Sequence, residues 1–198
     1  LNGYPKYSLQ VTKSFDNILD SDFDFTQVNF KINHQIKRLN AATTSFLLQG
    51  GIVFGEVPIS HLYNATPNYT YKNPWFNRIT FAGKNSFETM AFNEFISDKY
   101  VMLQVKHKLF KRLKITKKVN PEITLVSRAA IGDIENPINH TGFTFRKMNK
   151  GYFESGIEIN KIYKGFGINA FYRYGAYQNT NWSDNLAIKL SYQLNLGF

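Results

Sequence analysis

Four ionisable side chains of opposite sign fall in the C-terminal half of the chain: Arg128, Glu154, Glu158 and Arg173. Each lies on the polar side of a segment in which apolar and polar residues alternate. If these segments are neighbouring strands, opposite charges can pair across the sheet, and leaving them unpaired away from water would be costly. The cluster could simply pack the wall of a sheet. Alternatively, it could anchor the long connecting segment, residues 58–98, which would fold against it.

No other set of residues has the pattern of a catalytic or metal site. His61 and His140 stand alone in connecting segments, which is not the spacing of a metal-binding pair. The chain has no cysteine, no glycine-rich phosphate loop and no serine between glycines at a strand-to-helix elbow. We therefore expect no enzymatic activity, no cofactor and no bound metal.

A basic run could bind phosphate groups. Its members are Lys106, Lys108, Lys111, Arg112, Lys114, Lys117 and Lys118, in a chain of net charge +10. Clustered Lys and Arg are typical of nucleic-acid binding. However, Phe110 is the only aromatic residue in the run that could stack on a base. We therefore expect no nucleic acid, and a solvated rim that faces lipid phosphates or periplasmic partners instead.

The elements that would hold these residues are eight segments with period-two alternation. They cover residues 4–13, 25–37, 43–57, 99–110, 122–131, 152–162, 166–178 and 186–198. Most are about ten residues or longer, which is the length of a tilted strand that crosses a bilayer. No stretch approaches the roughly 20 apolar residues of a membrane-spanning helix. The alternation predicts antiparallel β-strands with one apolar and one polar face.

The connections between these segments alternate in length. The short ones are residues 38–42, 111–121 and 163–165, and the long or polar ones are 14–23, 58–98, 132–151 and 179–184. Transmembrane barrels have short turns on the periplasmic side and longer loops outside, and their aromatic residues gather near strand ends. A soluble ligand-binding barrel would also alternate, but its strands are usually shorter. The pattern favours a transmembrane, antiparallel, up-and-down β-barrel over residues 1–198.

The last segment resembles the C-terminal signal by which barrel proteins are recognised for insertion. The residues that carry the resemblance are Tyr192, Leu194, Leu196 and Phe198, although Gln193 stands where such signals often have glycine. This implies contact with the barrel assembly machinery, and a true chain end at Phe198. Leu1 is expected to be only the beginning of this piece, with any signal peptide already removed.

Several strings resemble a Bacteroidota outer-membrane family whose members carry a carboxypeptidase-like regulatory domain ahead of a C-terminal barrel. The strings are Gly50-Gly-Ile-Val-Phe-Gly-Glu-Val-Pro58, Phe87-Glu-Thr-Met90, Asn93-Glu-Phe-Ile-Ser-Asp-Lys-Tyr-Val101 and Tyr152-Phe-Glu-Ser-Gly-Ile-Glu-Ile-Asn160. That barrel is similar to the BamA-like surface-antigen superfamily, whose barrels have sixteen strands. Residues 58–98 occupy the position of the longest functional loop of that superfamily. The superfamily's Arg-Gly tip is absent here, which puts assembly or secretion activity in doubt.

Together these patterns predict the C-terminal portion of an outer-membrane barrel, with about eight strands here and about sixteen in all. The expected function is non-enzymatic, as a surface or envelope-assembly component. Expected partners are outer-membrane lipid, lipopolysaccharide, the barrel assembly machinery and possible other envelope proteins. An outer-membrane channel or transporter is the main alternative, and a soluble ligand-binding barrel is a weaker one.

Overall fold

The chain is all-β. The computed structural model describes residues 3–16, 22–38, 42–69, 79–109, 121–137, 140 and 144–193. Strands dominate this part of the chain, and the helical pieces in it are two short 3₁₀ turns, η1 (Ile59–His61) and η3 (Trp182–Asn185). Among these residues, none form a helix of the length and apolar character needed to cross a membrane.

Eight long strands occupy the eight segments that alternate in the sequence. They are β1 (Gly3–Ser14), β2 (Phe25–Lys37), β3 (Thr43–Gly55), β7 (Lys99–Lys108), β8 (Glu122–Asp133), β9 (Tyr152–Tyr163), β10 (Phe166–Tyr174) and β11 (Leu186–Tyr192). The predicted all-β class and the positions of these strands are therefore confirmed. The described strands stop earlier than predicted at the ends of β3, β7, β10 and β11.

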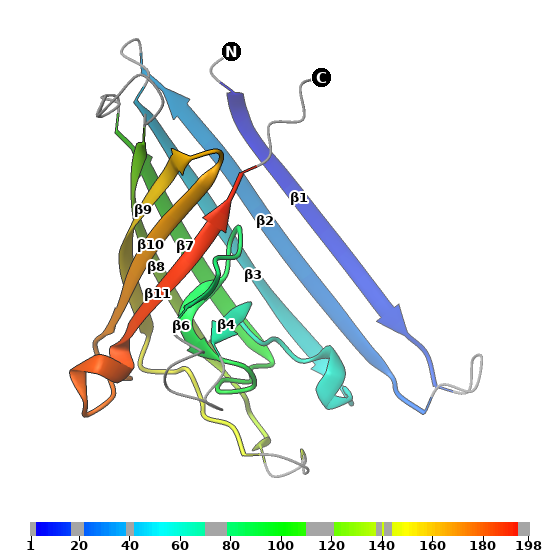
Figure 1. Cartoon of the computed structure of the whole chain (residues 1–198). Helices are drawn as coiled ribbons and strands as arrows, with labels where there is room; N and C mark the ends of the chain where they lie inside the picture. The colour runs from blue at the N-terminus through cyan, green and yellow to red at the C-terminus, as the bar shows by residue number, and fades with distance from the viewer. Residues whose placement is uncertain are drawn as a thin grey trace.

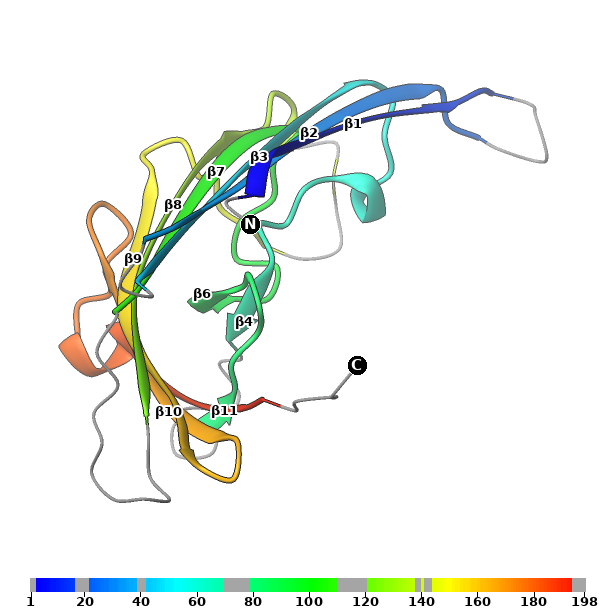
Figure 2. The same cartoon turned by 90° about the horizontal axis from the view of Figure 1, so that it is seen from above.

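Together with the short strand β5 (Ile79–Phe81), these strands form one curved, mostly antiparallel sheet in the order β1-β2-β3-β7-β8-β9-β10-β11-β5. Each long strand pairs with the next long strand along the chain, as in an up-and-down meander. Viewed from above, the sheet bends into a deep trough (Figure 2). Over the described residues, β1 and β11 do not pair with each other. The antiparallel connectivity is thus present, whereas closure into a barrel is not.

We call residues 58–98 the inserted segment. Its described residues, 58–69 and 79–98, lie on the concave side of this trough (Figures 1 and 2). The segment contains three short strands, β4 (Pro67–Tyr69), β5 (Ile79–Phe81) and β6 (Phe87–Ala91). β4 and β6 pair in parallel, and β5 pairs in parallel with β11, the last of the long strands. The inserted segment therefore contacts both the inner face of the sheet and one of its edges.

The two faces of the sheet have opposite chemistry. On the concave face, the side chains of Arg128, Glu154 and Arg173 are 2% exposed or less. On the convex face, Leu125 and Ile157 are 44% and 46% exposed. The alternation along β8 to β11 produces this arrangement, because adjacent side chains of a strand point to opposite faces. On β8 to β10 the buried ion pairs are therefore on the concave face, and the exposed side chains of the convex face include large apolar groups.

The two ends of the trough also differ. At one end, which we call the turn end, β9 and β10 are joined by Lys164 and Gly165, both with positive φ (46° and 91°). Two consecutive residues with positive φ are characteristic of the tight hairpin turns that match strand twist. At the other end, the loop end, the inserted segment and residues 134–151 connect the strands.

Candidate functional site

The strongest concentration of buried charge lies where the inserted segment meets the concave face. Glu154, on β9, is its centre: its carboxylate accepts hydrogen bonds from the backbone N–H of Glu88 (3.2 Å) and Thr89 (2.7 Å) and from the Thr89 hydroxyl (2.5 Å). Thr89 also shares a hydrogen bond with the Tyr152 hydroxyl at 2.7 Å. One carboxylate on the sheet therefore binds strand β6 through its backbone.

Arg128, on β8, supplies the countercharge. Its register partner on β9 is Glu154, and Arg128 Nη1 donates to Glu154 Oε1 at 2.5 Å. Arg128 Nε donates to Gln104 at 2.8 Å, and the guanidinium lies 4.7 Å from the centre of the Phe171 ring. A buried charge of this kind is tolerated only when it is paired and hydrogen-bonded. The cross-strand pairing predicted for Arg128 is present.

Arg173, on β10, makes a different contact from the one its strand position suggests. It lies opposite Glu154 in the register, yet its guanidinium forms a fork with Glu94 of the inserted segment, at 2.6 and 3.1 Å. Such two-pronged ion pairs are stronger and more directional than single hydrogen bonds. The guanidinium also lies 4.8 Å from the centre of the Tyr152 ring. Arg173 is therefore a second anchor for the inserted segment.

A third anchor, Lys189 on β11, was not in the predicted cluster. Its ammonium, on a fully buried side chain, donates to the Asn68 carbonyl and the Thr80 hydroxyl, both at 2.5 Å. The carboxylate of Glu88 lies 3.8 Å from this ammonium, and burial raises the pKa of the Glu88 carboxyl above its usual value. The hydrogen-bond partners of Lys189, Asn68 and Thr80, are in a segment that has no alternating pattern, so this contact could not be predicted from the sequence.

Glu158 also lies on the concave face of the sheet, but its ion pairs among the described residues are with other sheet residues and not with strand β6. Its carboxylate pairs with Lys106 at 2.8 Å and lies 3.9 Å from Arg128. Lys106 also donates to the Lys84 carbonyl, at 3.1 Å. Within the basic run, Lys108 pairs with Glu122, while residues 111–118 lie outside the described part of the chain. Lys106 and Lys108, the members of the basic run that the structure describes, therefore each pair with a carboxylate of the sheet.

Apolar packing surrounds the charged contacts. The core is formed by side chains of the inserted segment and of the sheet together: Leu47, Ala65, Phe87, Met90, Phe95, Met102, Ala130, Met148, Tyr152 and Tyr177. The Tyr177 hydroxyl donates to the Lys147 carbonyl at 2.6 Å and ties the loop before β9 to this core. Burial of these side chains supplies non-directional stabilisation, and the ion pairs fix the position of the segment.

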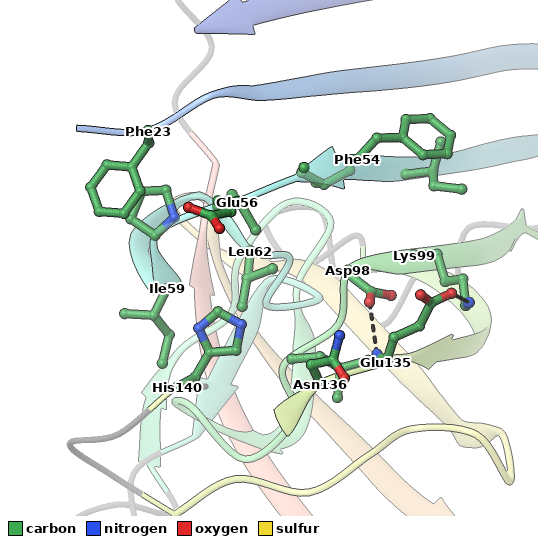
Figure 3. Close-up of a pocket in the computed structure, with 16 residues that line it drawn as sticks. Phe23, Phe54, Glu56, Ile59, Leu62, Asp98, Lys99, Glu135, Asn136 and His140 are labelled. Carbon is green, nitrogen blue, oxygen red and sulfur yellow. Dashed lines mark hydrogen bonds and ion pairs between the residues drawn. The ribbon is translucent and has the colours of Figure 1, made fainter. Parts of the chain in front are cut away.

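A separate cavity of about 800 Å³ opens at the loop end. Figure 3 shows its lining, in which the apolar side chains of Ile59 and Leu62 face ionised groups. These groups already contact one another: Lys99 pairs with Glu135 at 2.7 Å, and Asp98 accepts the Glu135 backbone N–H at 2.8 Å. The cavity offers a mixed surface, but its ionised pairs have no evident nucleophile or proton-relay geometry.

The two histidines considered as metal ligands lie apart from the charged cluster. His140 lines the loop-end cavity, and the His61 ring packs 5.1 Å from the Phe25 ring. In the described part of the chain, no three His, Asp or Glu side chains are grouped so that they could hold a metal ion.

The structure describes only one of the four residues that resemble an insertion signal. Tyr192 ends β11, where its half-exposed ring lies 4.7 Å from the Phe166 ring. Leu194, Leu196 and Phe198 fall beyond the last described residue.

Comparison of the chain with protein-family models, with curated proteins and with solved structures found no match. The resemblance to the Bacteroidota family and to the BamA-like superfamily therefore remains a prediction.

Proposed function

We propose that this chain forms part of an integral β-barrel of the outer membrane of a Gram-negative bacterium, with the inserted segment filling its lumen. The observation that carries the proposal is the opposite chemistry of the two sheet faces. Soluble proteins mostly bury apolar side chains and expose charged ones. This sheet does the opposite, because Leu125, Ile157 and Ile168 are exposed and Arg128 and Arg173 are buried. In a bilayer, lipid solvates the apolar convex face, and the polar groups pair inside.

Exposed aromatic rings at both ends of the strands support the same proposal. Phe54, Phe153 and Tyr174 lie toward the loop end, and Tyr163, Phe166 and Tyr192 toward the turn end. On β10, Phe166 and Tyr174 are eight residues apart, which is about 27 Å along a strand and about 21 Å after a ~40° tilt. The apolar band of outer-membrane barrels is about 25 Å tall and is flanked by such rings.

The remaining wall of the barrel would come from strands that pair with β1. β1 pairs with β2 on one edge, and Tyr7 and Leu9 on this strand are 73% and 72% exposed. An edge strand with exposed backbone groups is a template for another strand. We propose that strands outside the described sheet complete a larger barrel here.

The proposed role is that of a surface or envelope-assembly component without enzymatic activity. Its partners would be outer-membrane lipid, lipopolysaccharide and, during insertion, the barrel assembly machinery. The ion pairs of Glu154, Arg173 and Lys189 support a filled lumen, because they hold the inserted segment against the wall.

Membrane fractionation tests the proposal. The full-length protein, expressed in a Gram-negative host, should stay in the outer-membrane fraction after an alkaline carbonate wash. Ile157→Arg, which places a charge on the convex face, should cost about 2–4 kcal/mol near the bilayer midplane and reduce the inserted amount. Phe92→Arg is the matched control, since Phe92 is exposed outside the sheet. Release of the wild-type protein by the wash would refute membrane integration.

A channel is the second candidate, because the concave face carries charged groups that could line a pathway. Conductance in planar bilayers separates the two roles. The filled lumen predicts no stable open steps, whereas sustained steps from the wild-type protein would favour the channel.

A further inference from the structure

A groove of about 460 Å³ lies near the loop end, on strands β2, β3, β7 and β8. Its walls include the apolar side chains of Val28, Phe30, Ile52, Val101 and Ile131, and Lys99 lies at its rim. The ion pairs and core described above do not involve these apolar side chains. Ligand pockets of a few hundred Å³ with apolar walls and a few polar groups are typical of binding sites for small molecules.

The register places this groove on the convex face. Ile52 lies opposite Val28 on one side and Lys99 on the other, and Val101 lies opposite Ile131. Directly opposed residues of antiparallel strands have their side chains on the same face. Val101 and Ile131 are 42% and 52% exposed, so this is the face opposite to the inserted segment.

A glycine shapes one wall. The Phe30 ring lies against β3 at Gly50, where an added Cβ would stand only 2.7 Å from the ring. The absence of a side chain at Gly50 lets the ring pack down onto the backbone. Neighbouring apolar side chains on β7 and β8 can then form the other wall of the hollow.

Two lysines at or near the groove take part in partly exposed ion pairs: Lys99 lines the groove, and Lys147 pairs with Asp133, which also lines it. Lys99 pairs with Glu135, whose side chain is 70% exposed, and Lys147 pairs with Asp133 at 3.1 Å. Exposed ion pairs contribute little to stability, so these ammonium groups can exchange their partners at small cost. A lipid phosphodiester carries one negative charge, like a carboxylate, and a phosphomonoester such as those of lipid A carries up to about two. Either group can therefore replace the carboxylate partner of a lysine.

We propose that the groove binds one acyl chain of an anionic membrane lipid, whose phosphate meets Lys99 and Lys147. This inference rests on the proposed membrane location. The apolar walls of the groove suit a hydrocarbon chain, and the positive charges of the two lysines suit the phosphate of the headgroup. Their position at the loop end would place the lipid in the outer leaflet.

Native mass spectrometry of the full-length protein in detergent tests the inference, with phosphatidylglycerol, lipid A and diacylglycerol as the added lipids. Val101→Phe fills the groove and should lower the affinity for all three about tenfold, the loss expected when about two methylene groups stay unburied. Leu125→Phe, on the same face but outside the groove, is the matched control and should bind like the wild type. The double variant K99Q/K147Q should bind phosphatidylglycerol no better than diacylglycerol.

Equal binding by Val101→Phe and Leu125→Phe would overturn the groove. Preference for lipid A over phosphatidylglycerol would identify lipopolysaccharide as the source of the chain, and the reverse preference would identify a phospholipid. A wild type that binds diacylglycerol as well as either phosphorylated lipid would overturn the role of the lysines. If the protein resists the carbonate wash and yet fails this test, only the groove is refuted; release by the wash would refute the membrane location itself.

Discussion

At the scale of single residues, Glu154 has an unusual concentration of donors. Two backbone N–H groups, a hydroxyl and a guanidinium all reach its carboxylate, and the side chain is completely buried. Hydrogen bonds to an ionised group are shorter and stronger than those between neutral groups, so this set can offset the cost of removing the charge from water. One side chain thereby joins strand β9, strand β8 and the inserted segment.

Glu154→Gln should be strongly destabilising. The amide keeps the shape of the side chain but leaves the Arg128 charge buried without its closest countercharge, which typically costs about 3–5 kcal/mol. Urea unfolding in detergent micelles, followed by intrinsic fluorescence, measures the change in the free energy of unfolding. Glu135→Gln is the control, because its ion pair is exposed and should contribute nothing measurable. A Glu154→Gln protein as stable as that control would mean that the buried pair does not stabilise the fold.

The sequence could predict one side of this contact only. Arg128, Glu154 and Arg173 stand at regular positions in alternating strands, so their inward direction followed from strand geometry. Their partners Glu88 and Glu94 lie in a segment with no repeating pattern. The fork between Arg173 and Glu94 joins residues 79 positions apart, a distance over which local spacing carries no information.

At the scale of elements, the inserted segment should be released by loss of a single anchor. Arg173→Ala removes the fork to Glu94 and should raise the rate of trypsin cleavage after exposed Lys84 by about tenfold to a hundredfold, since the population of the open state limits cleavage. Glu122→Ala is the matched control on the concave face, because its ion pairs are with Lys108 and Lys161 of the sheet. Limited proteolysis of the folded protein gives both rates, and equal rates would contradict anchoring by Arg173.

The tight turn between β9 and β10 should be sensitive to a single methyl group. Gly165 has a φ of +91°, and an added Cβ would stand 2.6 Å from the Gln193 carbonyl oxygen. Gly165→Ala should therefore destabilise the hairpin by about 1–2 kcal/mol. Gly3→Ala provides the control, since no atom lies within 4 Å of the Cβ it would add. Thermal unfolding measures the midpoint temperature of both variants. An unchanged midpoint for Gly165→Ala would show that the turn tolerates a side chain at this position without strain.

Long strands could be predicted because period-two alternation continues over about ten residues. β4, β5 and β6 could not, because they have only three to five residues each and pair in parallel with partners far away in the sequence. Three residues carry too little alternation to separate a strand from a loop. The packing of the inserted segment on the sheet therefore had to come from the structure.

At the scale of the whole molecule, the buried ion pairs lie on the concave face of the curved sheet, and exposed aliphatic side chains lie on its convex face. A sheet that curves around buried ion pairs and presents aliphatic side chains outward is suited to a bilayer, where the solvent is apolar. Among the described residues β1 pairs with β2 alone, so closure of this sheet into a barrel would need further strands. Alternation predicted the two faces of each strand, but the number of strands that close a barrel depends on tilt and stagger, which alternation does not encode.

Spin labels on the convex face can measure whether this face contacts lipid or water. The chain contains no cysteine, so single cysteines at Leu125, Ile157, Ile168 and Ile188 can carry spin labels without background labelling. With the full-length protein in lipid vesicles, electron paramagnetic resonance compares collisions with oxygen, which concentrates in lipid, against collisions with a water-soluble nickel chelate. We predict high oxygen and low nickel accessibility at all four positions, and the reverse at Asn181 in a loop. High nickel accessibility at the four convex positions would contradict the account.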